Sequence, residues 1–373
     1  LEIAEKYGSL REINLEAKEE ESLLSQENFT SEELEILKVI AIFRESVPSE
    51  YIEQITSCKD IIPRINELIR RGVLDEVPVA GRVAFAFASS FLKEKFFEAL
   101  SKDDIKKITD KSIEIVKENE EDNHDEVLHQ LEISERTNDY KDYLFNVAEK
   151  LKKANDAEGA ILYYTRALEK SDGIEDIRII YENITESYLE LANFKKLEEI
   201  LGEIALLIEE TGDLKLNLIY YETNIAMALF NYDLAKYESF APIFKSYVEK
   251  SGDEIYRILY MRYEAEAYQT NVEYDKAKKF YKKIIALSEG VEDLNKVKSF
   301  ALRGLGVIQF YGSSSSSDKK GLLKAAALFD EARRFARKIG DVSSEIKCTN
   351  NIATVNRSLG DFREAKREYS KAL

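Results

Sequence analysis

The chain has 373 residues, of which 44% are hydrophobic and 34% charged, and its formal net charge is −17. A chain of this length exceeds one compact core, and its apolar runs are too short to span a membrane, so we expect two or more folding units. The sparing use of cysteine, with two in the whole chain, and the absence of a signal peptide favour a cytoplasmic setting.

Residues 31–118 predict three helices followed by a β-hairpin. Thr30-Ser31-Glu32-Glu33 is a helix-start signal, and apolar residues follow at helical spacing from Leu34 to Ala41. A short second helix is expected at 49–55, and a third from about 60 to 71, ended by Gly72. Residues 73–77 and 82–87 then predict two strands around a turn. Three helices and a hairpin make a winged helix.

Residues 119–139 are predicted to form an acidic helical linker. It carries His124 and His129, the two histidines of the chain. Zinc ligands on one helix are three or four residues apart, whereas a spacing of five points the two rings in different directions. We therefore expect no metal site in this linker.

Residues 140–373 predict a solenoid of about six repeats of paired helices, with a period of about 40 residues. A Gly-Asp pair punctuates it at 212–213, 252–253, 340–341 and 360–361. One small or aliphatic residue marks each second helix. In most repeats a large residue follows four positions later and a small or aliphatic one seven positions later, all on one face. The markers are Ala160, Leu197, Ala235, Ala277, Ala325 and Ala365. The pattern is poorer at Ala235, because Ser239 and Pro242 occupy the two later positions.

A serine-rich run, Gly312–Gly321, lies between the two helices of the fifth repeat. Such a composition predicts a flexible surface loop. A tolerated insertion explains it; a phosphorylated or partner-binding loop is the alternative.

Both ends of the chain suggest that it is a piece of a longer protein. It lacks an initiator methionine, and it stops at Tyr369–Leu373, inside the second helix of a repeat. A solenoid normally ends in a polar capping helix, so we expect truncation at the C-terminus. Residues 1–30 are then the end of an upstream region or a linker helix.

The repeats resemble the tetratricopeptide repeat (TPR), whose paired helices stack into a right-handed α–α superhelix. One series that carries the resemblance is Leu144, Val147, Ala148, Leu151, Ala160, Tyr164 and Ala167. The resemblance implies a mainly α protein with a concave groove that binds a protein or peptide, with a small-molecule inducer as the alternative ligand.

The segment Phe85–Ser101 and the run Arg70-Arg71-Gly72-Val73-Leu74 resemble STAND-type signalling ATPases, which run from a P-loop ATPase through a winged helix into TPR-like repeats. Because this chain has no P-loop motif, the resemblance implies that ATP or ADP binds in an upstream domain and that this chain holds no cofactor. Many relatives carry a histidine near the position of Ser89, where it can reach the nucleotide phosphates. Ser89 is therefore a candidate position facing another domain and its nucleotide, although here it is a serine and not the histidine of those relatives.

Aromatic and arginine side chains on the expected first helices are candidates for partner contact. Tyrosine offers rigid, amphipathic area, and arginine offers polar contacts. Packing within the solenoid core is the alternative role for each tyrosine. The candidates are Tyr220, Arg257, Tyr260, Arg262, Tyr263 and Arg303.

Three functions fit these features. The first is a non-catalytic sensor scaffold that relays partner binding through the winged helix to an upstream nucleotide switch, and the second is a stand-alone TPR adaptor. The third is a DNA-binding regulator, whose contacts would come from Lys59, Arg64, Arg70, Arg71 and Arg82. Residues 31–100 carry 9 basic and 12 acidic side chains, which argues against DNA. The sequence contains no catalytic motif that we could identify.

Overall fold

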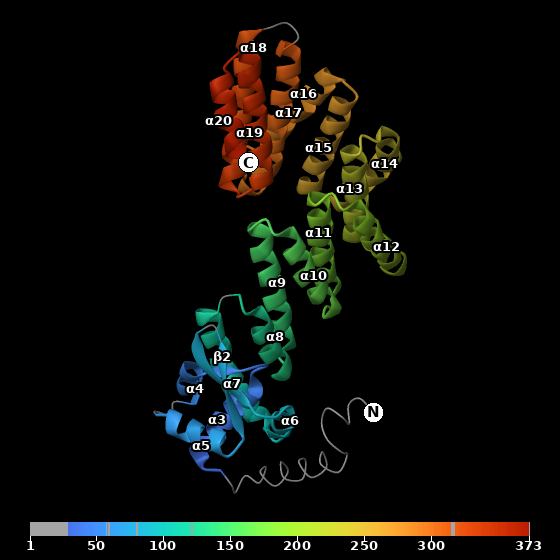
Figure 1. Ribbon diagram of the computed structural model, residues 1–373. Helices are drawn as coiled ribbons and strands as arrows, with labels where there is room; N and C mark the ends of the chain where they lie inside the picture. The colour runs from blue at the N-terminus through green and yellow to red at the C-terminus, as the bar shows by residue number, and fades with distance from the viewer. Residues whose placement is uncertain are drawn as a thin grey trace, which may run out of the picture. The chain divides into compact units, whose positions relative to one another are not determined.

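The computed structural model describes residues 29–56, 58, 60–79, 81–120, 122–314 and 318–372, and these are mostly helical with one small sheet (Figure 1). The linker helix expected in residues 1–30 falls outside the described residues except for Phe29 and Thr30. Among the described helices, none combines the length and the apolar character that a membrane crossing requires. The chain divides into two compact units, unit 1 (residues 1–147) and unit 2 (residues 148–373).

Unit 1 contains the three predicted helices, followed by a hairpin and further helices. The helix-start signal is confirmed, because Thr30 Oγ1 accepts a hydrogen bond from the Glu33 amide at 3.2 Å and Glu33 Oε2 accepts one from the Thr30 amide at 2.7 Å. The division between the units falls inside the last helix. The helices are α3 (Ser31–Ile42), α4 (Ser49–Thr56), α5 (Ile62–Arg70), α6 (Ser90–Glu98), α7 (Lys102–Asn119), α8 (His124–Ile133) and α9 (Thr137–Lys153).

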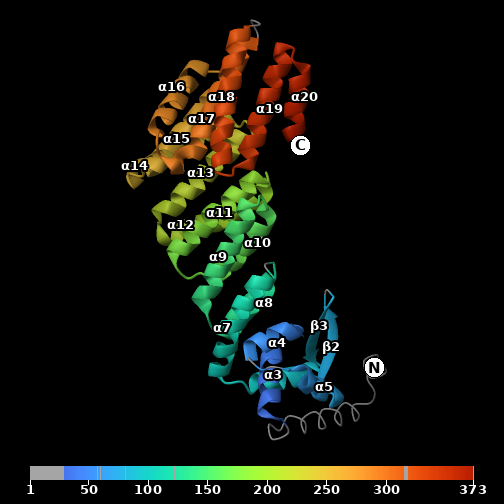
Figure 2. The same cartoon turned by 90° about the vertical axis from the view of Figure 1, so that its left-hand side faces the viewer.

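The sheet of unit 1 has three antiparallel strands in the order β1-β3-β2. Figure 2 labels the hairpin strands β2 and β3. They are β1 (Val47–Pro48), β2 (Leu74–Val79) and β3 (Arg82–Phe87). The hairpin of β2 and β3 confirms the predicted strands, with Leu74 opposite Phe87. Strand β1 was not predicted, since two residues carry no alternation of apolar and polar side chains.

The core of unit 1 is centred on α3, which contacts α4, α5, α6 and α7. Ile36 and Ile40 of α3 are fully buried. The two histidines hold helices together: His129 Nε2 lies 3.0 Å from the Ile42 carbonyl oxygen, and His124 Nδ1 lies 3.0 Å from the Tyr143 hydroxyl. No group of three metal-ligating side chains occurs in the described part of the chain.

Unit 2 is a series of helical hairpins, consistent with a helical-repeat solenoid. Each helix packs against the next, and the first helices of the hairpins, α11, α13, α15, α17 and α19, also contact one another in succession. The first helices therefore form one continuous layer. The elements are α10 (Ala157–Glu169), α11 (Ile174–Glu190), α12 (Phe194–Thr211), α13 (Leu214–Phe230), α14 (Leu234–Ser251), α15 (Glu254–Thr270), α16 (Tyr274–Leu287), η2 (Glu292–Leu294), α17 (Asn295–Ser314), α18 (Lys319–Lys338), α19 (Val342–Leu359) and α20 (Phe362–Ala372).

The Gly-Asp punctuation works through the two capping rules of helices. Gly212 and Gly252 end α12 and α14 with φ of 64° and 65°, a left-handed conformation that glycine adopts without strain. The following aspartate caps the next helix: Asp213 accepts from the Leu216 amide at 2.9 Å, and Asp253 accepts from the Ile255 amide at 2.8 Å. One dipeptide thus stops one hairpin and starts the next.

The predicted markers are buried in their second helices, with one correction. Leu197, Ala277 and Ala365 are buried, each three residues after the first residue of its helix. In α14 the equivalent residue is Tyr237, and Ala235 is exposed. The marker at Ala235 was therefore wrong.

The reason for the error is an inversion of sizes in α14. The buried residues at the three marker positions are Tyr237, Ala241 and Phe244, whereas Ser239 and Pro242 are exposed. A large residue stands where most other repeats have alanine, and alanine stands where they have a large residue, so the pair fills a similar volume. A search for a small first residue consequently selects the wrong register.

The serine-rich run is less of a loop than predicted. Helix α17 continues to Ser314 and α18 begins at Lys319, while residues 315–317 lie outside the described part. Ser313 is buried and its hydroxyl lies 2.9 Å from Gln309 Nε2. These contacts extend the helix into a sequence whose composition favours a loop.

The turns inside the hairpins carry backbone strain at regular intervals. Ala192, Tyr232 and Val272 lie 40 residues apart and have φ of 52°, 57° and 64°. A left-handed conformation costs a non-glycine residue roughly 1–2 kcal/mol, and it is least suited to a β-branched side chain. Val272 therefore stores strain in an exposed turn, where it is 66% accessible.

Replacing Val272 by glycine is expected to raise the free energy of unfolding by about 1 kcal/mol, because glycine removes the clash between Cβ and the backbone. Urea denaturation followed by circular dichroism measures the change. Val272→Ala is the matched control: it keeps Cβ and should gain less. A glycine variant less stable than the alanine variant would contradict the strain.

Candidate functional site

The candidate site is the layer of first helices in unit 2, where ionisable side chains recur with the repeat period. Glu182 of α11, Glu222 of α13 and Arg262 of α15 lie 40 residues apart and so occupy equivalent positions. We call the surface formed by these helices the inner face. Its carboxylates lie mainly on α11 and α13, and its cations lie mainly on α15, α17 and α19.

Glu186 of α11 is the centre of an ion cluster on the inner face. Lys152 Nζ lies 2.6 Å from Glu186 Oε2, and Lys296 of α17 bonds to Glu186 Oε1. Desolvation opposes the charged form of Glu186, but the two lysines outweigh it and lower its pKa to about 2. Lys296 is 110 residues away in sequence, so this contact connects repeats that are not neighbours.

The pKa of Glu222 is shifted in the opposite direction to that of Glu186. It is half-buried, and the Tyr263 hydroxyl donates to its Oε1 at 3.0 Å. Desolvation raises the pKa of Glu222 to about 7, although the Tyr263 hydrogen bond and the charge of Arg262 favour the carboxylate. Glu182 and Glu186 add repulsion. Two glutamates on adjacent first helices therefore differ widely in acidity.

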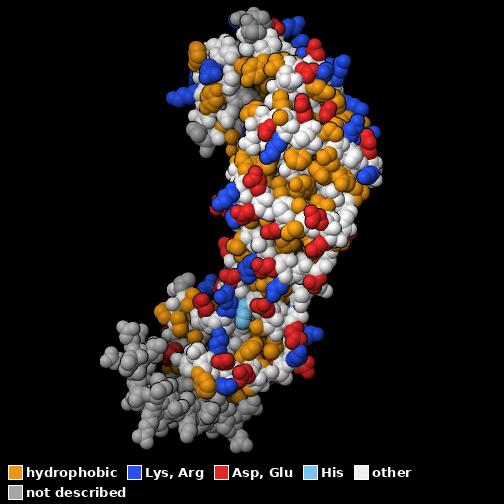
Figure 3. Space-filling model, turned by 90° about the vertical axis from the view of Figure 1, so that its right-hand side faces the viewer, with side chains coloured by type: hydrophobic (Ala, Val, Ile, Leu, Met, Phe, Trp, Pro, Cys, Tyr) orange, Lys and Arg blue, Asp and Glu red, His pale blue; other side chains and the backbone are white. Residues whose placement is uncertain are grey.

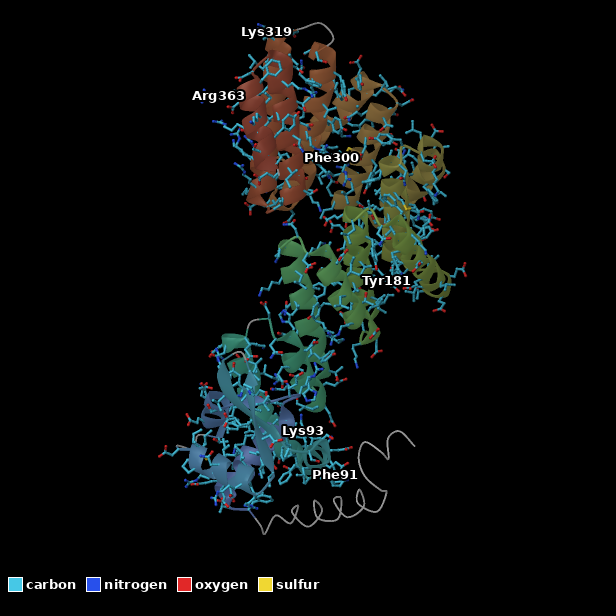
Figure 4. All side chains as sticks on the ribbon, viewed as in Figure 1. Phe91, Lys93, Tyr181, Phe300, Lys319 and Arg363 are labelled. Carbon is cyan, nitrogen blue, oxygen red and sulfur yellow. The ribbon has the colours of Figure 1, made fainter. Side chains whose placement is uncertain are left out.

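Arg262 is held by aromatic rings. Its guanidinium carbon lies 4.7 Å from the ring centre of Tyr263 and 4.6 Å from that of Phe300. Its Nε is buried and has no hydrogen-bond partner among the described residues. Arg303 approaches the same Phe300 ring, with its guanidinium carbon 5.1 Å from the ring centre. Figure 4 labels Phe300 on α17, beside α15.

The charged side chains of the inner face are partly exposed and partly desolvated. The side chains of Glu186 and Lys296 are 36% and 55% accessible. Desolvation is nevertheless the largest influence on the pKa of each. Partial burial therefore strengthens the electrostatic contacts among these groups.

The residues predicted from the sequence take different positions. Arg262 and Arg303 lie against Phe300, and buried Tyr263 packs against Arg262. The Tyr260 hydroxyl donates to Glu264 at 2.9 Å, and half-buried Tyr220 packs edge-to-face on Tyr221. Arg257 is exposed and paired with Glu254. Contact of these residues with a partner stays a prediction.

Ser89, the predicted interdomain position, lies in unit 1 and caps α6. Its hydroxyl accepts a hydrogen bond from the Leu92 amide at 3.4 Å. This local role accounts for a serine at the start of a helix. A nucleotide-facing role for Ser89 stays a prediction.

Sequence reasoning missed the acidic part of the inner face and its counter-ions. Glu182, Glu186, Glu222, Lys296 and Lys347 were not singled out. Aligning the first helices at the 40-residue period would have placed Glu182 and Glu222 together. The pairing of Glu186 with Lys296 has no local signal, because it depends on how the repeats are arranged in space.

Replacing Glu186 by glutamine is expected to lower the free energy of unfolding by about 1 kcal/mol at low salt, since partly exposed ion pairs are screened. The pKa of Glu186 is depressed, so its contribution is present above its ordinary pKa and is lost as pH falls towards 2. A double-mutant cycle with Lys296→Gln measures the coupling. Equal effects of Glu186→Gln alone and in the Lys296→Gln background would contradict the pairing.

Comparisons with known proteins give a partial likeness to solved structures. No protein-family model matches the chain, and no curated protein matches it. One solved structure that is similar in part is a Signal Transduction ATPase with Numerous Domains (STAND) protein with a tetratricopeptide repeat sensor from Pyrococcus horikoshii, at 15% sequence identity and a TM-score of 0.39. The match covers 93% of this chain and 63% of that one.

Proposed function

We propose that the chain is a non-catalytic regulatory scaffold that binds a protein or peptide partner on the inner face of unit 2. In this proposal unit 2 is a right-handed TPR-like superhelix, and unit 1 is a winged helix that relays binding to an upstream ATP- or ADP-dependent switch in the cytoplasm. The observation that carries the partner proposal is the buried Arg262 Nε on the inner face, which has no hydrogen-bond partner among the described residues. The relay rests on the sequence resemblance of residues 85–101.

The chemistry of the inner face supports binding rather than catalysis. Unit 2 contains no histidine, and its one cysteine, Cys348, is buried. Desolvation raises the pKa of the Cys348 thiol to about 11, which leaves it protonated and poorly nucleophilic near neutral pH. The glutamates of the inner face contact lysine and tyrosine side chains, which are recognition and stabilising contacts.

The contacts of α5 support a structural winged helix over a DNA reader. Arg64 Nε lies 2.5 Å from Glu32 Oε2, Arg71 lies 3.4 Å from Glu33, and Arg70 pairs with Glu67. Cations already paired with carboxylates have little to offer to phosphates. Lys59 lies outside the described residues, and Arg82 is exposed. Figure 3 shows acidic side chains interspersed with basic ones on the face of unit 1 that it presents.

A peptide-display selection on the purified chain tests the partner proposal. We expect enriched peptides whose affinity falls at least tenfold in Arg303→Ala and is unchanged in Lys283→Ala, an exposed position on α16. The inner face should supply the contacts that an outer lysine does not. Peptides that bind both variants as tightly as the parent would place binding elsewhere and overturn the proposal.

A further inference from the structure

Three cations of the inner face lie on successive first helices, α15, α17 and α19. They are Arg262, Arg303 and Lys347. The Phe300 ring brings the two guanidinium groups together, since their central carbons lie 4.6 Å and 5.1 Å from its centre. Lys347 lies on α19, which contacts α17. Desolvation lowers the pKa of Lys347, and the charges of Arg303 and Arg262 lower it further. Like charges have therefore been gathered at one place.

These cations lack the ion pairs that other arginines of unit 2 make. Arg178 pairs with Asp213 and Glu175, and Arg333 pairs with Glu368 at 2.8 Å and with Asp330 at 2.5 Å. Among the described residues, Arg262, Arg303 and Lys347 have no carboxylate within 4.0 Å.

The stacking of Arg262 leaves its Nε donor without an acceptor among the described residues. Cation–π contacts use the flat faces of a guanidinium, whereas its hydrogen-bond donors lie in the plane. The buried Nε of Arg262 has no acceptor. Leaving a buried, charged donor without an acceptor costs free energy. An oxygen acceptor supplied by a ligand would remove this cost.

Acidic groups surround the cations without pairing with them. Glu222 and Glu266 act on Arg262 from α13 and α15, and Asp341 and Glu190 act on Lys347 from the start of α19 and from α11. These groups lower the repulsion among the three cations, but among the described residues none of them forms an ion pair with the cations. This arrangement is typical of a site in which an anionic ligand pairs with the cations.

We propose that Arg262, Arg303 and Lys347 bind a phosphate group of a ligand, with Phe300 holding the two guanidinium groups in place. Three cations match a doubly charged phosphate better than a singly charged carboxylate, and the arginine fork matches its oxygens. The proposal rests on the proposed function, because it names the chemical group that the inner face recognises. The phosphate can belong to a small molecule or to a phosphorylated peptide.

Isothermal titration calorimetry with inorganic pyrophosphate tests the site. We expect saturable binding by the parent chain at constant ionic strength, weakened about tenfold by Lys347→Gln and by Arg303→Gln, as loss of one charged hydrogen bond predicts. Lys347 and Lys283 are both exposed, so Lys347→Gln should fold and Lys283→Gln is the matched control. Equal binding by all variants would show an adventitious ion only and would overturn the site.

Parallel titrations identify the source of the phosphate. A phosphoserine peptide that competes with pyrophosphate would support a peptide ligand, and competition by ATP or ADP alone would support a small molecule. Failure of every phosphate probe to bind would overturn the phosphate site. Peptides from the display selection that still bind in that case would leave the proposed function standing.

Discussion

Replacing Glu222 by glutamine is expected to raise the free energy of unfolding by about 2 kcal/mol at pH 8, because a pKa shift of this size corresponds to a few kcal/mol. Desolvation raises the pKa of Glu222 from 4.5 to about 7, so the folded chain disfavours the carboxylate. Stability from the neutral form is fully present below pH 4.5 and is lost as pH rises through 7. Glutamine keeps an acceptor for Tyr263 and carries no charge.

Urea denaturation of both proteins from pH 5 to pH 8 measures this effect. The two stabilities should converge towards pH 5 and separate as pH rises. Tyr263→Phe serves as a second variant: it removes a hydrogen bond to the carboxylate and should move the decline to higher pH. Parallel curves for the parent and Glu222→Gln would show that Glu222 titrates in the same way in both states.

Replacing Gly304 by alanine is expected to lower the free energy of unfolding by roughly 2 kcal/mol, as overpacking does. A Cβ on Gly304 would lie 2.4 Å from Cζ of Tyr281. That ring is 1% accessible, and its hydroxyl donates to Gln269 at 3.0 Å, so it has little freedom to move. The strain should outweigh the gain of about 1 kcal/mol that alanine brings to a helix.

The matched control for this prediction is Gly202→Ala. Gly202 also lies within a helix, α12, but a Cβ there meets nothing within 4 Å. It should stabilise the chain by up to about 1 kcal/mol. Thermal and urea unfolding of both variants measure the difference. Stabilisation by both substitutions would contradict the close approach of α17 to Tyr281.

The parts of the fold that could be predicted are those with local chemistry. The Gly-Asp punctuation combines a left-handed stop with a side-chain cap, and both act within a few residues. The capping box at Thr30 and the hairpin after Gly72 are local in the same sense. The register of α14 could not be predicted, because Tyr237 and Ala241 exchange the sizes found in the other repeats.

The candidate site was only partly predictable. Arg262, Tyr263 and Arg303 were proposed because they lie on first helices. The structure places the two arginines against Phe300 and Tyr263 against Arg262. The burial of the Arg262 Nε and the pKa of Glu222 depend on several helices at once. A sequence pattern indicates which face of a helix a residue occupies. It does not indicate whether the polar atoms of that residue find hydrogen-bond partners on the neighbouring helices.

The contact of Glu186 with Lys296 has a mechanical consequence. In a simple solenoid each repeat touches only its neighbours, so the array can stretch like a soft spring. Here one carboxylate connects α11 with α17 across two intervening hairpins. Pulling these helices apart must first break that tether, and because the pair is partly exposed, dissolved salt weakens it. The elasticity of unit 2 should therefore be set by the ionic strength of its surroundings.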